Sequence, residues 1–392
     1  MTAAALSDLR ILDLSNHVAG PFCTKLFADF GADVIKVEAP GEGDTARHIG
    51  PFPNGAFDLE TSCLFLYLNT NKRSITLDIE SPTGQSLVRE LVAQCDIVVE
   101  TFDVGVMQEM GLGFDRLEVL RPGLILTSIT PFGQTGPWCG YQSTDLIAHA
   151  ASGLSAVNRV AGGKPLREPG YQTDYQGGAV AFLATMSAVC YRDMEGVGQH
   201  VDIAIQEAAA TMIAPEITRV AYAGRSPGMR LGFLPCQDGY VTLNVRNDDA
   251  WRQLWEFLGH PEGAEEPRFR TIRDRRARQA EMEAHLLPYL EKFTMQELFD
   301  GLQPHRILVG MALDMPHLID NAHLHARDFF AQAEHPVAGH LLFPGAPFKM
   351  SGTPWSLRQP APLLGEHNED IYIGLLGHRH EELTEWQATN MI

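Results

Sequence analysis

The chain has 392 residues, of which 45% are hydrophobic and 20% charged, so it is long enough for two globular domains with sizeable cores. Its 49 acidic and 30 basic residues give a formal net charge of −19 at pH 7, which repels nucleic acid and anionic membrane surfaces. No secretory leader and no run of uncharged apolar residues long enough for a membrane span is visible, and the six cysteines are scattered without a C-x-x-C pair. These features predict a cytoplasmic protein that binds neither nucleic acid nor membrane.

Short apolar runs alternate with amphipathic stretches through the first half of the chain. The runs are RILDLS (10–15), DVIKVEAP (33–40), SITLDI (74–79), DIVVETF (96–102) and LILTSITPFG (124–133). Apolar runs separated by helical periods are typical of parallel strands covered on both faces. Ser81 and Pro82 mark the start of one of the intervening helices. The sequence therefore predicts an α/β fold, with a doubly wound, mostly parallel sheet in a large domain over residues 1–205.

A change of composition follows the large domain. A loop rich in Gly, Arg and Pro lies within a predicted linker at 206–230. Residues 231–315 are predicted to form a small α+β domain that includes a hairpin turning at Asp238-Gly239. The remainder, 316–392, is turn-rich and cannot build a core alone, so we expect it to return and complete the large domain.

Three familiar motifs fail on inspection. The strand, helix and strand ending at Glu38 imitate a dinucleotide-binding unit, but the turn NHVAGP (16–21) has one glycine where G-x-G-x-x-G is needed, so Glu38 is expected to face solvent. GRSPG (224–228) matches a serine hydrolase elbow, but Pro227 has no N–H to offer an oxyanion. The histidine clusters lack the spacing of metal ligands, so no metal site is expected.

The stretch GYQTDYQGG (170–178) places Asp174 between two tyrosines, ahead of a Gly-Gly pair and an alanine-rich helix. An aspartate in that position is more often a helix N-cap than a catalyst. A carboxylate with a pKa of about 3.9 is also ionised at neutral pH, so it needs no base to act as a nucleophile. Taken alone, these residues favour the cap.

The wider context resembles the family III CoA-transferases, also called the CaiB/BaiF family. The matching pieces cover nearly the whole large domain and the C-terminal return, and only weakly the small domain; they include LRILDLSNHVAGPFCTKLFADFGADVIKVEAPGEGDTAR, LNTNKRSITLDIESPTGQSLVRELVAQCDIVVETF, STDLIAHAASGL and TDYQGGAVAFLATMSAVCYRDMEGVGQHVDIAIQEA. The resemblance implies an interlocked homodimer whose subunits have large and small domains joined by two linkers. It also implies an enzyme that moves CoA from an acyl-CoA to a small carboxylic acid, with the CoA thioester as substrate and no permanently bound cofactor.

The resemblance also implies the site residues. The family's nucleophile falls on Asp174, which would form an aspartyl mixed anhydride and then an aspartyl-CoA thioester. Gly177 and Gly178 are expected to form the oxyanion and acyl site, because residues without a Cβ allow close approach of the thioester. The expected CoA contacts follow the strands: Val18, Ala19, Leu77, Asp78, Ile79, Glu80, Thr101, Phe102, Asp103, Ser143, Thr144 and Asp145, together with Arg73.

Some positions depart from the family. Where formyl-CoA transferase has two arginines and a lysine for the CoA nucleotide, this sequence has Ala39, Glu109 and Glu80. Two interpretations stay open: the nucleotide is bound more weakly, or it is bound by other cations such as Lys36, Arg47 and Arg73. A glycine-rich loop that covers the formyl-CoA transferase site is represented here at best by Gly228 and Gly232.

Two further functions stay open beside CoA transfer. An α-methylacyl-CoA racemase-like isomerase needs a base and an acid on opposite faces of the α-carbon. Its histidine and glutamate correspond to Thr144 and Asn247 here, which favours a transferase. A CoA-binding protein without catalysis is the other possibility, suggested by the lost cations.

Overall fold

The computed structural model describes residues 4–158, 163–224, 232–262 and 266–392. The chain divides into two compact units, Met1–Pro227 with Asp328–Ile392, and Gly228–Arg327. The second unit thus reaches beyond the predicted range 231–315. The predicted linker 206–230 holds helices in its described part, while residues 225–230, and with them Gly228, lie outside the described residues.

The first unit is built on a six-stranded sheet in the order β3-β2-β1-β4-β5-β6, and every pair of neighbours is parallel. Its strands are β1 (Arg10–Leu14), β2 (Asp33–Glu38), β3 (Arg73–Thr76), β4 (Ile97–Glu100), β5 (Ile125–Thr130) and β6 (Gln199–Ala204). The prediction of an α/β fold with a parallel sheet is confirmed.

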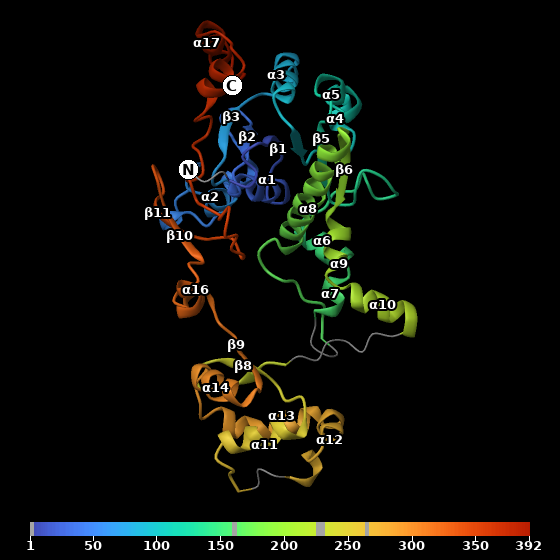
Figure 1. The fold of residues 1–392 in the computed structure, drawn as a ribbon, viewed down its shortest axis with the longest axis vertical. Coiled ribbons are helices and arrows are strands. Elements are labelled where there is room, and N and C mark those ends of the chain that lie inside the picture. Colours follow the sequence, from blue (N-terminus) through green and yellow to red (C-terminus); the bar gives the residue numbers. More distant parts are fainter. Residues whose placement is uncertain (1–3, 159–162, 225–231, 263–265) are drawn as a thin grey trace. The chain divides into compact units, whose positions relative to one another are not determined.

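Helices cover both faces of this sheet (Figure 1). Alternate residues of a strand point to opposite faces. Leu12 belongs to the buried cluster that includes residues of α3 (Pro82–Ala93), α5 (Phe114–Leu120) and α17 (His380–Ala388), whereas Ile11 belongs to the cluster with residues of α1 (Ala19–Asp29) and α8 (Gln172–Glu195). The shorter helices of this unit are α2 (Cys63–Leu68), α4 (Val106–Glu109), α6 (Asp145–Ala151), α7 (Leu154–Val157), α9 (Ile205–Thr211), α10 (Ala214–Ala223), η1 (Thr45–His48), η2 (Pro53–Gly55) and η5 (Asp370–Leu375).

The strand order reverses between β1 and β4, and this creates a crevice at their carboxyl ends. The chain moves outward from β1 to β3 and then returns to β4 on the other side of β1. The loops after β1 and β4 are joined by a hydrogen bond from the Asn16 N–H to Thr101 Oγ1 at 2.9 Å. Open α/β sheets bind ligands at such a reversal, so this edge is where a site is expected.

The C-terminal segment returns to the first unit and covers the free edge of β3. After the hairpin β10 (Phe330–His335) and β11 (Gly339–Pro344), the His367 N–H donates to the Ser74 carbonyl at 2.9 Å and the Tyr372 hydroxyl to the Thr76 carbonyl at 2.8 Å. The backbone groups of an edge strand are thereby satisfied within the chain.

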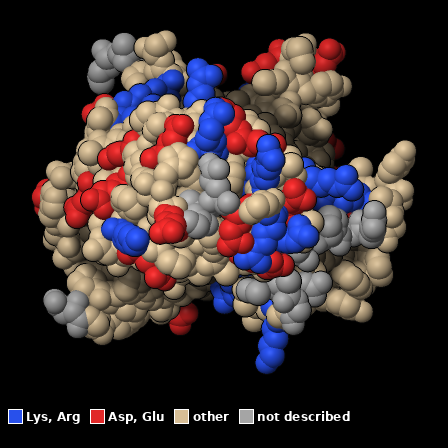
Figure 2. All heavy atoms as spheres, turned by 90° about the horizontal axis from the view of Figure 1, so that it is seen from below, with Lys and Arg blue, Asp and Glu red and all other residues tan. Residues whose placement is uncertain are grey.

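The second unit contains an antiparallel sheet of β7 (Leu234–Pro235), β8 (Tyr240–Asn244) and β9 (Leu308–Met311), and the predicted turn at Asp238-Gly239 is confirmed. Its helices are α11 (Asp248–Phe257), η3 (Pro267–Phe269), α12 (Ile272–Ala277), α13 (Gln279–Leu290), α14 (Met295–Leu302), η4 (Gln303–His305), α15 (Met315–Ile319) and α16 (Ala322–Ala326). Figure 2 shows one face of the molecule, on which Lys and Arg side chains lie beside Asp and Glu side chains. Within the described residues, we find no helix with the length and apolar character needed to cross a bilayer.

A group of fully buried ion pairs occupies the carboxyl ends of β1 and β2. Glu38 accepts hydrogen bonds from Nε and Nη2 of Arg47, at 2.7 and 2.9 Å. The expectation that Glu38 faces solvent is wrong, because the residue is only 3% exposed. Lys36 Nζ lies 2.6 Å from Asp44 Oδ2, and Lys72 Nζ lies 3.0 Å from Asp13 Oδ2. Charges with so little access to water are stable only while each keeps its partner.

Replacement of Glu38 by Gln tests this dependence. We expect Glu38→Gln to lower the free energy of unfolding by about 3 kcal/mol, because it leaves the buried Arg47 charge short of a partner. The control is Glu60→Gln, since Glu60 also binds Arg47, at 2.7 Å, but is partly exposed. Its cost should stay below about 1 kcal/mol. Urea denaturation compares the two, and equal costs would contradict the expectation.

Candidate active site

Asp174 is the third residue of α8 and does not cap it. The N-cap is Tyr171, whose backbone is left-handed (φ 59°, ψ 37°) and whose side chain makes no capping hydrogen bond. The interpretation of Asp174 as an N-cap is therefore wrong. Asp174 as a whole residue is 7% exposed, which is uncommon for an acid without a close cationic partner.

Asp145, the first residue of α6, anchors the start of α8. Its Oδ1 accepts hydrogen bonds from the N–H and the hydroxyl of Thr173 at 2.9 and 2.7 Å, and its Oδ2 accepts one from Nη2 of Arg167 at 3.1 Å. The Thr173 N–H is one of the donors that a helix start leaves free, so Asp145 acts as a cap from another helix. The carboxylate of Asp145 thus holds the turn that carries Asp174, and the predicted CoA contact of Asp145 stays a prediction.

His17 is the side chain that faces Asp174, and the sequence reasoning missed it. Its Nε2 lies 3.8 Å from Asp174 Oδ2, and its ring meets the Tyr171 ring edge-on at 5.0 Å. His17 has a left-handed backbone (φ 72°) that is fixed by a hydrogen bond from its N–H to Asp44 Oδ1 at 3.0 Å. The sequence feature that could have indicated His17 was its place in the loop after the first strand of a doubly wound sheet, where ligands bind.

The environment changes the ionisation of both groups. Burial, followed by the negative charge of Asp145, raises the pKa of Asp174 to about 7, against the opposing charge of Arg167. Burial also lowers the pKa of His17, although Asp44 and Asp145 act in the other direction. The pair therefore consists of a carboxyl group poised near neutrality and an imidazole that favours its neutral form. The sequence-based value of about 3.9 for Asp174 does not hold in the fold.

Gly177 and Gly178 serve the packing of α8. A Cβ on Gly178 would lie 2.4 Å from the Ala19 carbonyl oxygen, and one on Gly177 would lie 2.9 Å from Ile205. The space next to both glycines is thus filled by α1 and α9, and their N–H groups lie within the helix, where the backbone already uses them. The predicted oxyanion and acyl role of this pair is therefore corrected to close helix packing.

The remaining predicted CoA contacts gather at the carboxyl edge of the sheet. Side chains of Val18, Ala19 and Leu77 are buried, so only their backbone can face a ligand there. Asp103 Oδ2 accepts a hydrogen bond from Gln142 Nε2 at 3.2 Å, which joins the loop after β4 to the segment containing Ser143 and Thr144. A cavity of about 240 Å³ has the lining residues Ile79, Glu80, Phe102, Val106, Glu109 and Met110. Three predicted CoA contacts thus line one cavity: Ile79 and Glu80 from the loop after β3, and Phe102 from the loop after β4.

The three other cations considered for binding the CoA nucleotide do not lie at this site. Lys36 and Arg47 are fully buried and paired with Asp44 and Glu38, so neither can reach a phosphate. Arg73 begins β3, at the opposite edge of the sheet, where its Nε donates to Asp33 at 2.9 Å. Its predicted CoA contact is wrong because the carboxyl ends of the strands lie at the other edge.

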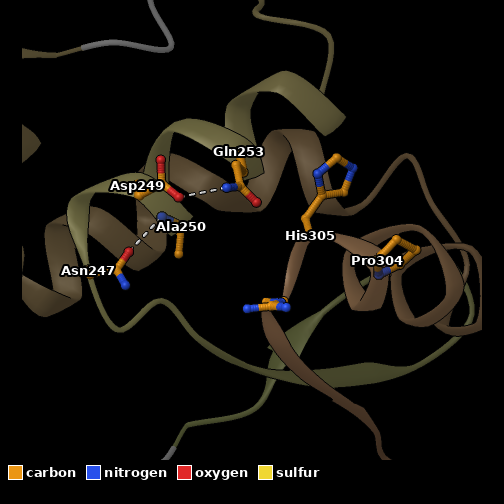
Figure 3. Close-up of a pocket in the computed structure, with 7 residues that line it drawn as sticks. Asn247, Asp249, Ala250, Gln253, Pro304 and His305 are labelled. Atoms are coloured by element: carbon orange, nitrogen blue, oxygen red, sulfur yellow. Dashed lines mark hydrogen bonds between the residues drawn. The ribbon is translucent and has the colours of Figure 1, made fainter.

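A larger cavity of about 470 Å³ lies in the second unit and contains none of the predicted site residues (Figure 3). Its wall includes Asn247, Asp249 and Gln253, and the side chains of Asn247 and Asp249 accept hydrogen bonds from neighbouring residues of the protein. Asn247 Oδ1 caps α11 by accepting the Ala250 N–H at 2.8 Å, and Asp249 accepts Gln253 Nε2 at 2.7 Å. Among the described residues, Asp174 is a buried carboxyl group at a helix start that faces an imidazole, so we take its surroundings as the candidate site.

Removal of the Asp174 carboxylate should stabilise the protein in a pH-dependent way. The pKa of Asp174 is about 7 in the fold against an ordinary 3.8, so between these values the folded state keeps a proton that the unfolded chain loses. The free energy of unfolding then falls as pH rises through this window. Asp174→Asn does not show this fall, so its advantage in free energy of unfolding should grow from less than about 1 kcal/mol at about pH 4 to on the order of 4 kcal/mol at about pH 8.

Denaturation at both pH values measures this difference. Asp193→Asn, an exposed site near the other end of α8, controls for the loss of one negative charge. An Asp174→Asn protein that is no more stable than the original at about pH 8 would contradict the raised pKa.

Comparison with known proteins identifies the family of this chain. Residues 6–368 match the family model described as CoA-transferase family III. The succinyl-CoA–D-citramalate CoA-transferase of Chloroflexus aurantiacus is 32% identical, over 99% of this chain and 98% of its own. The succinyl-CoA:glutarate CoA-transferase of Mus musculus is 33% identical, over 96% of this chain and 87% of its own.

A solved structure shares the fold. A CaiB/BaiF family protein from Brucella suis matches with a TM-score of 0.87 and 28% identity, over 95% of this chain and 99% of its own. The sequence-based resemblance is confirmed: the chain belongs to CoA-transferase family III and is a CoA-transferase of the CaiB/BaiF type that acts on CoA thioesters.

Proposed function

We propose that this enzyme transfers CoA from an acyl-CoA to a carboxylic acid through covalent intermediates on Asp174. The observation that carries the proposal is a buried carboxyl group whose pKa is raised to about 7, at the start of a long helix and facing His17. Perturbed carboxyl groups in such surroundings are typical of catalytic sites. The names of the relatives join CoA donors to several different acids, so they do not select an acceptor for this chain.

The proposed cycle conserves the thioester bond energy. The Asp174 carboxylate attacks the donor thioester, forming a mixed anhydride and releasing the CoA thiolate. The thiolate attacks the aspartyl carbonyl, forming an aspartyl-CoA thioester and releasing the donor acid. The acceptor carboxylate then attacks that thioester to give a second anhydride and free thiolate, which takes the acceptor acyl group and restores Asp174. No bound cofactor takes part in these steps.

The start of α8 supports the charge that develops at each step. Among the described residues, no acceptor takes the N–H of Gln172 or Asp174, and these donors lie at the positive end of the helix dipole. They replace the two glycines as our candidates for stabilising the oxyanion. The Tyr175 ring packs edge-on against Phe22 at 4.9 Å beside the nucleophile, which helps to exclude water from the anhydride.

We place part of the CoA nucleotide in the cavity of about 240 Å³ beside the β3 and β4 loops. Ile79, Phe102 and Met110 offer apolar contact to a base, whereas Glu80 and Glu109 offer no positive charge to phosphate. The nucleotide is then held mainly by stacking and by backbone groups of the two loops. The cytoplasmic location stays a prediction from the sequence.

An interlocked homodimer is also part of the proposal. Helix α10 has no buried residue, and its Ile217, Val220 and Tyr222 are 51%, 48% and 94% exposed. Leu183 and Met194 of α8 are also more than half exposed. Apolar side chains in such number on neighbouring elements support a contact with a second copy.

Trapping of the intermediate tests the mechanism. Incubation with a panel of acyl-CoA donors and hydroxylamine should convert Asp174 to a hydroxamate, because the anhydride and the thioester are both activated acyl groups. Peptide mass mapping locates the change. Asp174→Asn should lose the label and more than about 1,000-fold in turnover. Asp193→Asn, an exposed control near the other end of α8, should keep the label. Full activity of Asp174→Asn would refute the proposal.

His17 keeps an isomerase as the second candidate, since its imidazole could exchange an α-proton together with Asp174. Such an enzyme would introduce solvent deuterium at the α-carbon of 2-methylacyl-CoA without any acceptor acid. We expect no deuterium above background, measured by mass spectrometry, and rapid incorporation without CoA transfer would favour the isomerase.

The dimer is tested by mass and by dilution. Sedimentation should give twice the chain mass of 43.2 kDa, and an interlocked pair should keep that mass after dilution to nanomolar concentration. The double substitution Ile217→Asp with Val220→Asp should impair assembly, whereas Thr218→Asp between them serves as a charge control. A monomer at micromolar concentration would contradict this part of the proposal.

A further inference from the structure

Arg167 is a cation beside the candidate site with most of its donors unused. Its side chain is 43% exposed, and within the described residues its only hydrogen bond is that from Nη2 to Asp145 at 3.1 Å. A guanidinium carries five N–H donors, so Nη1 and Nε are left to bind something else. The buried cations of this unit differ, since Lys36 and Lys72 are fully enclosed with their own carboxylates.

The position of Arg167 is fixed relative to the nucleophile. Asp145 holds Arg167 through one oxygen and the N–H of Thr173 through the other, and Thr173 directly precedes Asp174. The Arg167 charge is close enough to act against the rise in the pKa of Asp174. One carboxylate, that of Asp145, therefore ties a partly free guanidinium to the turn that carries Asp174.

Local charge changes when the acyl group arrives. In the anhydride and in the thioester Asp174 is neutral, and Asp145 shares its charge with Thr173 and Arg167. The chain as a whole carries a net charge of −19, which disfavours a doubly charged acid unless a cation meets it at the site. Arginine suits a carboxylate because its planar fork can form two parallel hydrogen bonds.

Resting on the function proposed above, we propose that Arg167 binds the second, non-reacting carboxylate of a dicarboxylic acyl group, so that the substrates of this site are dicarboxylic acids and their CoA monothioesters. A monocarboxylic acyl group of equal length places a methyl group against the guanidinium and leaves its donors to water. Hydrogen bonds to charged groups favour the dicarboxylic group by about 10- to 100-fold.

The test compares succinyl-CoA with butyryl-CoA, which have acyl chains of equal length and differ in a terminal carboxylate or methyl group. The measured quantity is the first-turnover release of succinate or butyrate in the absence of an acceptor, so no second acid affects the rate. The unchanged protein should react about 10- to 100-fold faster with succinyl-CoA. Arg167→Gln should reduce this ratio to near one, even where the loss of its bond to Asp145 slows both donors, and Arg167→Lys should give an intermediate ratio.

Lys164→Gln is the matched control, since it removes an exposed cation from the same segment and should leave the ratio unchanged. The proposal is overturned if the unchanged protein does not prefer succinyl-CoA, a result that does not require any variant to fold. It is also overturned if Arg167→Gln slows both donors equally, which is what a purely structural role on Asp145 would cause, or if Lys164→Gln removes the preference. If neither donor acylates Asp174, the proposed function itself fails; if both acylate it at equal rates, only the role of Arg167 fails.

Discussion

Buried charge at the carboxyl ends of β1 and β2 holds the loop on which the candidate site depends. Lys36 Nζ pairs with Asp44 and also donates to the Ser15 carbonyl at 2.9 Å, while Asp44 accepts the N–H of His17. These contacts impose a left-handed conformation on His17 and direct its imidazole to Asp174. Burial of charge is costly, so each member tolerates loss of its partner poorly. The site is positioned by a network that lies beneath it.

A second buried carboxylate, that of Asp145, positions the helix that carries Asp174. Asp145 fixes the first turn of α8 through Thr173, and the glycines at 177 and 178 allow that helix to lie directly on α1 and α9. Asp174 is thus carried on a rigid helix, and His17 on a loop tied to the sheet. Neither anchor neutralises Asp174, since no lysine or arginine pairs with it among the described residues. Its raised pKa costs stability and leaves a carboxyl group that is poorly solvated and reactive.

The protein and its substrates are both negatively charged, so they repel each other. A strongly acidic chain has to bind a CoA thioester and a carboxylic acid, yet it lacks the three cations expected from formyl-CoA transferase, and its basic residues near the sheet are mostly paired. In the proposed function, local groups therefore matter more than net charge: the N–H groups at the start of α8, the apolar cavity by the β3 and β4 loops, and the guanidinium of Arg167. Specificity then follows from a few groups at the edge of the sheet.

The sequence by itself determined the class of fold and the family, and it singled out the position of the proposed nucleophile. Continuous apolar runs predicted buried parallel strands, because a strand covered on both faces does not need alternating polar and apolar residues. The ordered motifs around Asp174 indicated the family. Contacts between distant residues decided the rest: Glu38 meets Arg47, Asp145 meets Thr173, and His17 meets Asp174 across 157 positions of the chain. Local pattern carries no information on such pairs or on burial. For that reason only the tertiary structure could show that Gly177 and Gly178 serve packing, that Arg73 lies at the wrong edge, and that the pKa of Asp174 is raised to about 7.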